Sequence, residues 1–188
     1  AVQDPLLVRE YCAQAISEPL NLAVAELLST LLRFQEKAHQ ADPAKALAKR
    51  RCVLGLRESV RGLRTNKVRL VVVAHNVEKI EAAGALDDMV MDVLRLARYK
   101  HNPMADRHEG IEVEERETPV PVIFAHTRRS LSKALRRSMR SSVVAVFSYD
   151  GANDQFKRVV RMAEDARAQF RAWQALPPQR EAAARGAA

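Results

Sequence analysis

Between Thr127 and Arg140 the sequence carries a run of basic residues that no acidic residue interrupts. The basic residues of this run are Arg128, Arg129, Lys133, Arg136, Arg137 and Arg140. A solvated helix face usually mixes charges of both signs, whereas a purely cationic segment is typical of contacts with phosphate groups. The chemistry that we expect from this segment is therefore electrostatic binding of a phosphate backbone.

A second basic cluster lies further upstream. It consists of Lys49, Arg50 and Arg51, followed by Arg57, Arg61 and Arg64, and Glu58 is the one acidic residue between Lys45 and Arg69. The two clusters lie on separate connections of the chain. This arrangement predicts that they flank one bent polyanionic backbone.

Residue types that would support catalysis lack the necessary spacing. The glycines Gly84, Gly110 and Gly151 stand alone, so no phosphate-binding glycine loop is present. The five histidines are scattered without metal-ligand spacing. Asp87 and Asp88 form a carboxylate pair, but their position at the start of a predicted helix favours a role in complementing the helix dipole. We expect a protein that is not an enzyme and that binds no cofactor or metal.

The overall composition agrees with a polyanionic partner. The chain has 188 residues, 47% of them hydrophobic, which is enough for a folded core. Lys and Arg number 31 against 23 acidic residues, and the formal net charge of +8 favours RNA, DNA or an acidic membrane surface through counterion release. Aromatic residues make up 5%, too few for a surface that stacks many unpaired bases. Many basic proteins bind no nucleic acid, so charge alone leaves the partner open.

The cysteines and the hydropathy bear on the compartment. Cys12 and Cys52 are far apart and show no paired spacing, which fits a reducing compartment and argues against disulfides and structural zinc. The longest apolar run, 70–74, is too short to cross a bilayer. The chain has no signal-like start and does not begin with Met, so we expect a fragment or a processed chain. We expect a cytoplasmic protein, with the nucleus as a second compartment.

The elements that must position the basic residues follow an alternating pattern. Pro19 can open a helix whose apolar residues then recur on one face, and Asp42-Pro43 starts a second helical segment. Strands are predicted at 68–74, 120–125 and 143–147 because of their apolar, β-branched character. Helices are predicted at about 86–97, at 127–138 and after Gly151. Strands that alternate with helices predict an α/β sandwich, with helices on both sides of a small sheet.

Two segments are predicted to be peripheral. Residues 100–119 are rich in Asp and Glu and lack periodicity, which indicates an exposed acidic loop. Residues 175–188 are rich in Pro, Ala and Arg, and we expect them to be disordered. The predicted organisation is an N-terminal helical extension at 1–44, an RNA-binding domain at 45–174 with the acidic loop inserted, and the tail.

Several ordered motifs resemble one protein family. The motifs are Arg33-Phe34-Gln35, Asp42-Pro43-Ala44-Lys45-Ala46, the run from Lys49 to Glu58, Asn76-Val77-Glu78-Lys79-Ile80, Gly84-Ala85-Leu86-Asp87-Asp88, the run from Val143 to Ala152, and Asp154-Gln155-Phe156. Together they cover most of residues 11–172. In this order they resemble the SECIS-binding branch of the kink-turn-binding ribosomal-protein family, whose fold is an α/β/α sandwich with a small mixed sheet. The run Phe147-Ser148-Tyr149-Asp150-Gly151-Ala152 is the most specific part of the match.

The resemblance implies a function in translation. It implies binding to the SECIS element, a kink-turn-like hairpin of selenoprotein mRNA 3' untranslated regions that contains sheared G·A pairs. It further implies partnership with the ribosome and with the selenocysteine-specific elongation factor, so that UGA is read as selenocysteine. A structural kink-turn-binding protein of the ribosome or of a small nucleolar particle would share the same core, and fold alone does not separate the two.

The resemblance also implies roles for individual residues. Gly55, Arg57, Glu58 and Arg61 match the family positions that face the sheared purine pairs, with Arg57 where the wider family has Asn. In these roles Gly55 permits close approach of the backbone, Glu58 accepts from guanine N–H groups, and Arg61 reaches phosphate. The other residues of the expected RNA interface are Lys49, Arg50, Arg51, Asn76, Glu78, Lys79, Arg128, Arg129, Met139, Arg140, Ser141 and Val143. The stretch 139–143 matches the loop that packs on an extruded nucleotide. A plain helix salt bridge is the alternative role for Glu58.

Overall fold

The computed structural model describes residues 11–77, 86–106, 111–138 and 140–175 of the chain. The elements in chain order are α1 (Glu18–Ala41), α2 (Pro43–Ala48), β1 (Cys52–Leu54), α3 (Leu56–Arg64), β2 (Leu70–Val73), α4 (Leu86–Arg98), β3 (Val122–Phe124), α5 (Arg128–Ala134), β4 (Val143–Val146) and α6 (Asn153–Gln174). The expectations for residues 1–10 and for the tail beyond residue 175 lie outside the described residues.

The strands form one mixed sheet with the order β1-β4-β2-β3. β2 and β3 are parallel, whereas β4 is antiparallel to both β1 and β2. Val72 pairs with Ile123 on one side and with Val144 on the other. Every residue of β2 and β4 is buried, because these two strands lie in the centre of the sheet and both of their faces are covered. The small mixed sheet that the family resemblance implied is confirmed.

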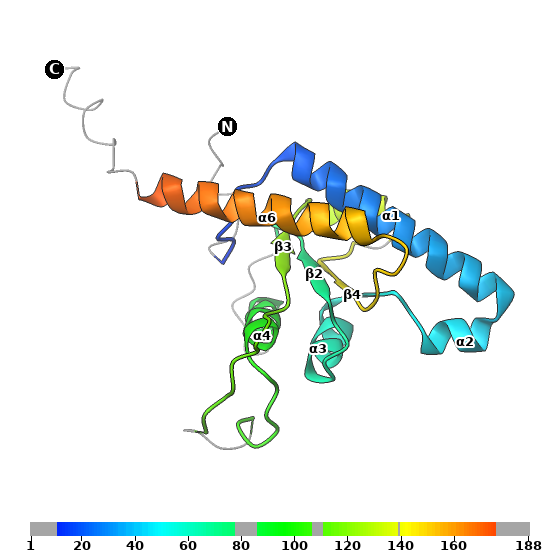
Figure 1. Cartoon of the computed structure of the whole chain (residues 1–188), viewed down its shortest axis with the longest axis horizontal. Helices are drawn as coiled ribbons and strands as arrows, with labels where there is room; N and C mark the ends of the chain where they lie inside the picture. Colours follow the sequence, from blue (N-terminus) through cyan, green and yellow to red (C-terminus); the bar gives the residue numbers. More distant parts are fainter. Residues whose placement is uncertain (1–10, 78–85, 107–110, 139, 176–188) are drawn as a thin grey trace.

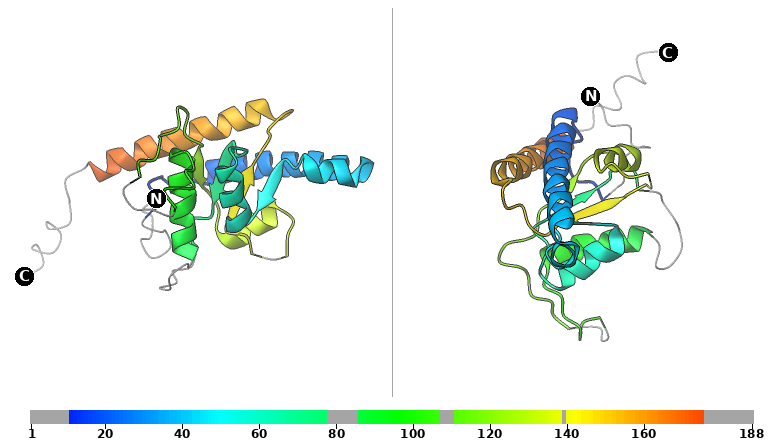
Figure 2. Two further views of the ribbon diagram at one scale, coloured as in Figure 1. Left: turned by 90° about the horizontal axis from the view of Figure 1, so that it is seen from below. Right: turned by 90° about the vertical axis from the view of Figure 1, so that its right-hand side faces the viewer.

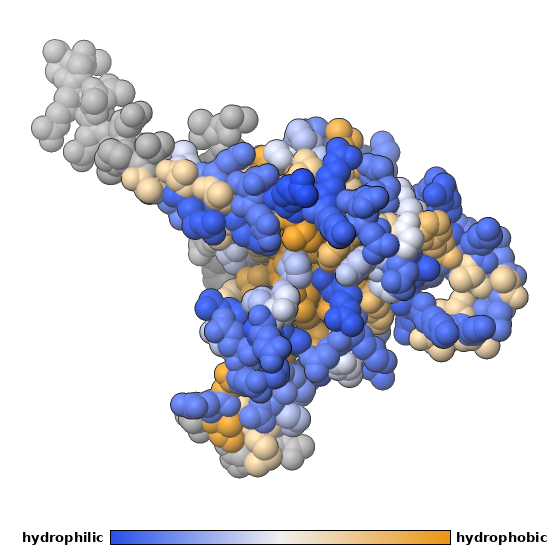
Figure 3. All heavy atoms as spheres, in the orientation of Figure 1, coloured by the Kyte–Doolittle hydropathy of each residue, from blue (hydrophilic) through white to orange (hydrophobic). Residues whose placement is uncertain are grey.

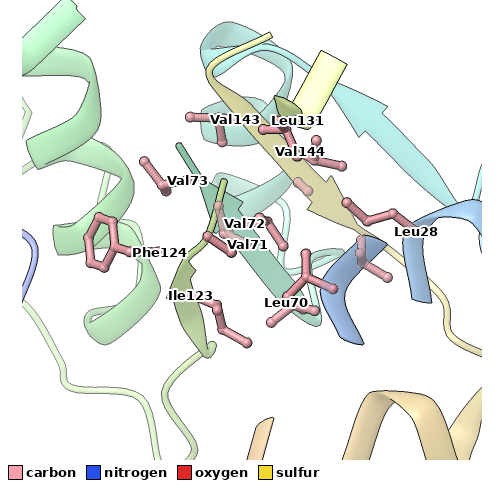
Figure 4. Packing of buried hydrophobic residues seen from close by; sticks show 14 of the residues in the cluster. Leu28, Leu70, Val71, Val72, Val73, Ile123, Phe124, Leu131, Val143 and Val144 are labelled. Carbon is pink, nitrogen blue, oxygen red and sulfur yellow. The ribbon is translucent and has the colours of Figure 1, made fainter. Parts of the chain in front are cut away.

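Helices cover both faces of this sheet, as expected for an α/β/α sandwich. α3 and α4 pack together on one face, and α1, α5 and α6 lie on the other (Figures 1 and 2). Figure 4 shows Leu28 of α1 and Leu131 of α5 beside Val144 of β4. All three side chains are fully buried, and full burial of a Leu side chain stabilises a fold by about 1.5–3 kcal/mol.

The N-terminal helix belongs to the same hydrophobic core as the sheet. Its buried residues are Leu20, Ala23, Val24, Leu27, Leu28 and Leu31, which confirms the predicted apolar face. Glu26 on its outer side accepts a hydrogen bond from Gln155 of α6 and lies 3.6 Å from Arg158. The outer surfaces of α1 and α6 are largely hydrophilic, while hydrophobic residues show between α6 and the sheet (Figure 3). The helical extension therefore completes one layer of the sandwich.

Two elements differ from the sequence-based expectation. β1 was not predicted, because a strand of three residues is too short to show a period of two. α5 ends at Ala134, four residues before the predicted end at Ser138. Arg136 has a φ of 52°, a left-handed conformation, and the N–H of Arg137 donates back to the carbonyl of Ser132. This pattern of bonds ends a helix in the way that a glycine normally does.

The acidic segment 100–119 is more than a peripheral loop. Arg116 donates from its guanidinium to the carbonyl of Leu63 at the end of α3 and to the carbonyl of Leu96 at the end of α4. It also donates to the side chain of Asn66. The last carbonyls of a helix lack intrahelical partners, so a single cation stabilises the ends of two helices at once. The acidic side chains among the described residues of the segment are exposed as predicted, but Arg116 ties the segment to the ends of α3 and α4.

Both cysteines are free thiols in the core. Burial raises the pKa of Cys12 to about 12 and the pKa of Cys52 to about 12. Both are therefore protonated at neutral pH and unreactive as nucleophiles. Among the described residues, no helix is long and apolar enough to cross a membrane.

Candidate nucleic-acid interface

A cleft of about 780 Å³ lies where α3 begins, next to α4 and to the start and end of the α5 segment. We call it the α3–α5 cleft. Its lining consists of Leu54, Gly55, Leu56, Arg57, Glu58, Met89, Arg128, Arg137, Ser138, Arg140, Ser141 and Ser142. The cleft thus joins residues that are more than 80 positions apart in sequence, including members of both basic clusters.

Gly55 forms the junction between β1 and α3 on the wall of this cleft. Its φ of 96° and ψ of 157° lie in a region that essentially only glycine adopts, so the type of residue is fixed by the backbone. Its N–H donates to the carbonyl of Val143 at 2.9 Å, which ties the junction to β4. A Cβ atom placed on Gly55 would meet nothing within 4 Å. The backbone here is therefore open to close approach by a ligand.

Glu58 lies in the first turn of α3 and is half-buried. Within the described part of the chain, no basic group lies within 4.0 Å of its carboxylate, although Arg57, Arg128 and Arg140 line the same cleft. For the alternative role of Glu58 as a helix salt-bridge residue, the described residues supply no ion-pair partner. A carboxylate that is free in a cationic cleft can accept hydrogen bonds from a ligand that also carries negative charge.

Arg57 and Arg61 extend the cationic surface along α3. Both side chains are exposed. They are four residues apart and therefore lie on one face of the helix, one turn from each other. Arg57 lines the cleft, whereas Arg61 lies outside its lining, one turn further along.

The start of α5 is held by two side-chain caps. Thr127 accepts from the N–H of Ser130, and the Ser130 hydroxyl accepts from the N–H of Thr127, forming a capping box. The Asn76 side chain accepts from the N–H of Arg128 at 2.7 Å. These bonds fix the backbone that presents Arg128 to the cleft. Arg129 is exposed next to it and does not line the cleft.

The connection between α5 and β4 is fixed by one buried hydroxyl. Ser132 is 5% exposed, donates to the carbonyl of Arg128 and accepts from the N–H of Ser141, both at 2.7 Å. This bridge holds the loop against α5. It brings Arg140 and Ser141 to the wall of the cleft opposite Gly55 and Glu58.

The structure therefore brings together six of the expected interface residues: Gly55, Arg57, Glu58, Arg128, Arg140 and Ser141. Glu78, Lys79 and Met139 lie outside the described residues. Lys49, exposed at the end of α2, does not line the cleft, and Arg50 lines a different groove. Asn76 contributes by positioning α5, as its bond to Arg128 shows.

Two of the expected contacts need revision. Val143 is fully buried in β4 and pairs with Val73, so its side chain belongs to the core and cannot touch a ligand in this conformation. Arg51 donates to the carbonyl of Asp150 at 2.6 Å and lies 5.3 Å from the centre of the Phe34 ring. Its guanidinium therefore joins α1, β1 and the start of α6, and a structural role explains it.

Sequence reasoning missed several lining residues. Arg137 belongs to the basic run between Thr127 and Arg140, and its charge could have indicated a phosphate contact. The direction of its side chain, however, depends on the left-handed turn at Arg136. Met89 of α4 is an apolar residue, and nothing in the sequence gave a reason to expect it at a ligand site. Ser138 and Ser142 carried no signal at all.

Comparison with known proteins identifies the class of protein. The profile of the ribosomal protein L7Ae/L30e/S12e/Gadd45 family matches residues 37–156, and the chain belongs to this family. A solved structure with a similar fold is the Giardia lamblia 15.5kD RNA binding protein, with a TM-score of 0.50 and 17% identity over 87% of this chain and 98% of that one. At this identity the likeness shows the fold alone.

Curated relatives are more similar in sequence. Selenocysteine insertion sequence-binding protein 2 of Rattus norvegicus is 34% identical over 163 residues, which are 87% of this chain and 17% of the relative. Selenocysteine insertion sequence-binding protein 2-like of Mus musculus is 34% identical over 174 residues, which are 93% of this chain and 14% of the relative. The chain thus spans less than a fifth of the length of these relatives. The expected resemblance to the SECIS-binding branch is confirmed, and the names of these relatives describe binding proteins.

Proposed function

We propose that this domain binds RNA at the α3–α5 cleft and that its target is the SECIS hairpin of selenoprotein mRNA. The observation that carries the proposal is the composition of one cleft. It combines an open glycine backbone at Gly55, an acceptor at Glu58 and the cations Arg57, Arg128, Arg137 and Arg140. The names of the curated relatives, at 34% identity, support the particular RNA.

The chemistry of the cleft suits a kinked RNA better than a straight duplex. A kink brings two segments of phosphate backbone close together, so their mutual repulsion rises and clustered guanidinium groups are needed to offset it. Sheared G·A pairs expose purine N–H groups, and a carboxylate can accept hydrogen bonds from these groups. In our proposal Glu58 reads these donors, Arg128 and Arg140 hold the flanking phosphates, and Gly55 permits the close approach.

The proposal extends to translation. A domain that holds the SECIS hairpin would act with the ribosome and the selenocysteine-specific elongation factor in the recoding of UGA to selenocysteine. This activity would take place in the cytoplasm, with the nucleus as a second compartment. Co-sedimentation of the chain with ribosomes, with and without a SECIS hairpin, tests the ribosomal part of the proposal. Absence of the chain from the ribosomal fraction in both cases would restrict the proposal to RNA binding.

The central experiment is a titration of three RNAs with the whole chain. The RNAs are a SECIS hairpin, a simple kink-turn and a straight duplex of equal length. We expect the SECIS hairpin to bind most tightly, with affinity falling by at least roughly tenfold between 50 and 200 mM salt because several phosphates are neutralised. Equal affinity for the simple kink-turn would favour a structural kink-turn-binding protein instead. Equal affinity for the duplex would contradict kink recognition altogether.

A further inference from the structure

A second groove, which we call the α1–α5 groove, lies on the other side of the α5–β4 connection. It measures about 650 Å³ and runs between α1, α2 and the end of α5. Its lining consists of Ser29, Thr30, Leu32, Arg33, Gln35, Glu36, His39, Ala46, Leu47, Arg50, Ala134, Leu135, Arg136 and Arg137. Three separate parts of the chain each contribute arginine to this lining: Arg33 from α1, Arg50 from the connection between α2 and β1, and the pair Arg136 and Arg137 from the turn after α5.

These arginines are not explained by ion pairing within the protein. Among the described residues, no carboxylate lies within 4.0 Å of the guanidinium groups of Arg33, Arg50 or Arg136. All three side chains are exposed, and Glu36 is the one carboxylate in the groove lining. Cations gathered from three elements repel one another, and a bound polyanion would relieve this repulsion.

The walls of the groove are held in place by other residues. The side chain of Gln35 accepts from the N–H groups of Arg51 and Cys52, at 2.8 and 3.0 Å, and so fixes α1 against β1. Asp42 caps α2 by accepting from the N–H of Lys45 at 3.0 Å. The spacing of the arginines is therefore set by packed elements, and not by the free motion of loops.

The groove borders the α3–α5 cleft, because Arg137 lines both. A phosphate backbone that leaves the cleft beside Arg137 would enter the groove without losing contact with a cation. The family match begins at residue 37, so Arg33 and every α1 residue of the groove except His39 precede it. The N-terminal helix therefore adds one wall of the groove to the family domain.

We propose that the α1–α5 groove is a second RNA site, which binds the phosphate backbone of a helix next to the kink. This inference rests on the proposed function and extends its footprint on the same RNA. The groove lining contains four arginines and no lysine. The planar guanidinium group of an arginine can bind a phosphate with two parallel hydrogen bonds. This lining therefore favours phosphate over an acidic peptide. No Phe, Tyr or Trp lines the groove, which argues against a surface that stacks several unpaired bases there.

The test uses the double variant Arg33→Gln/Arg50→Gln in the whole chain. Neither residue lines the α3–α5 cleft, so kink recognition itself is left intact. The matched control is Lys157→Gln/Arg161→Gln on α6, which removes the same charge from exposed positions. Neither Lys157 nor Arg161 lines the groove, and α6 lies on the opposite side of α1 from α5 (Figure 2, right). Thermal melting of both variants checks that they are folded.

Two SECIS-derived hairpins serve as probes, one with full flanking helices and one with both helices shortened to the kink. We expect Arg33→Gln/Arg50→Gln to weaken binding of the long hairpin roughly tenfold and to lower its salt slope by about two, because two phosphate contacts are lost. Binding of the short hairpin should change by less than about twofold on the same reasoning. Phosphate ethylation interference should lose signals in a flanking helix and keep those at the kink.

Two results would overturn the second site. In the first, Arg33→Gln/Arg50→Gln binds the long hairpin with the same affinity as the wild type. That result is expected if the groove binds an acidic peptide instead of RNA. In the second, the groove variant loses affinity equally for both hairpins, or the control variant loses as much affinity as the groove variant. Either outcome would indicate a general effect of net charge. The variant Glu58→Gln separates the two proposals. If it loses affinity while the groove variant does not, the cleft proposal stands and the groove proposal fails.

Discussion

The side chain of Asn76 accepts a hydrogen bond of 2.7 Å from the backbone N–H of Arg128, across 52 residues of sequence. Asn76 follows β2, and Arg128 is the first residue of α5, so the bond joins the connection after β2 to the start of α5. Together with the capping box of Thr127 and Ser130, this contact fixes the point at which α5 begins. It also determines where the Arg128 side chain enters the α3–α5 cleft.

The first prediction is that Asn76→Ala destabilises the protein by about 1 kcal/mol, the usual loss when a helix-capping acceptor is removed. RNA affinity should fall as well, since Arg128 is no longer held in place. Asn76→Asp keeps the acceptor and should melt close to the wild type. Asn153→Ala, at an exposed position of α6, is the control. Full stability of Asn76→Ala in chemical denaturation would show that the bond does not support α5.

The second prediction concerns Glu58. If its carboxylate reads purine N–H groups, Glu58→Gln should weaken binding of the SECIS hairpin by about 1–3 kcal/mol, the scale of a good base contact. Stability should stay unchanged, because no ion pair is lost within the described residues. Titration and thermal melting together check this, with the exposed Glu117→Gln as control. A variant that melts earlier but binds normally would give Glu58 a purely structural role.

The third prediction concerns Arg116, which contacts the ends of α3 and α4. Arg116→Ala should lower the free energy of unfolding by about 2–3 kcal/mol, since charge-assisted hydrogen bonds to the carbonyls of Leu63 and Leu96 are lost. Burial lowers the pKa of Arg116, but an arginine remains charged at neutral pH. Denaturant unfolding measures the loss, with Glu117→Gln as the neighbouring control. Equal stability of the two variants would show that the acidic segment can be removed without cost.

The fourth prediction is a pH dependence of stability that arises from His126. Burial lowers its pKa from the ordinary value of 6.5, while nearby Glu18 opposes this shift and His75 adds to it. The unfolded chain therefore binds a proton more readily than the folded one. The stability that neutral His126 contributes is present above about pH 6.5 and is lost as the pH falls through the lowered pKa.

His126→Asn tests this dependence. The φ of His126 is 65°, a left-handed value that Asn tolerates, and its backbone bonds to Asn21 and His75 do not need the imidazole. We expect the variant to lose less stability than the wild type between pH 7.5 and 5.5, as measured by denaturant unfolding. The same loss in both proteins would assign the acid sensitivity to other groups.

The sequence by itself determined the class of fold and the partner chemistry. The β-branched run 71–73 indicated a buried strand, and the repeated apolar positions of α1 indicated a covered helix face. These are local patterns, set by residues within a few positions of one another. The uncompensated charge of 127–140 likewise indicated phosphate, because net charge acts without regard to detailed geometry.

Only the tertiary structure decided which basic residues share a surface. Arg50 and Arg51 are neighbours in sequence, but Arg51 donates a hydrogen bond to the carbonyl of Asp150, whereas Arg50 lines the α1–α5 groove. Arg137 reaches both sites because Arg136 turns the chain in a left-handed conformation that no composition would predict. The direction of a side chain depends on backbone dihedrals and on contacts between residues distant in sequence. Such contacts exist only once the sheet and its two helical layers have packed together.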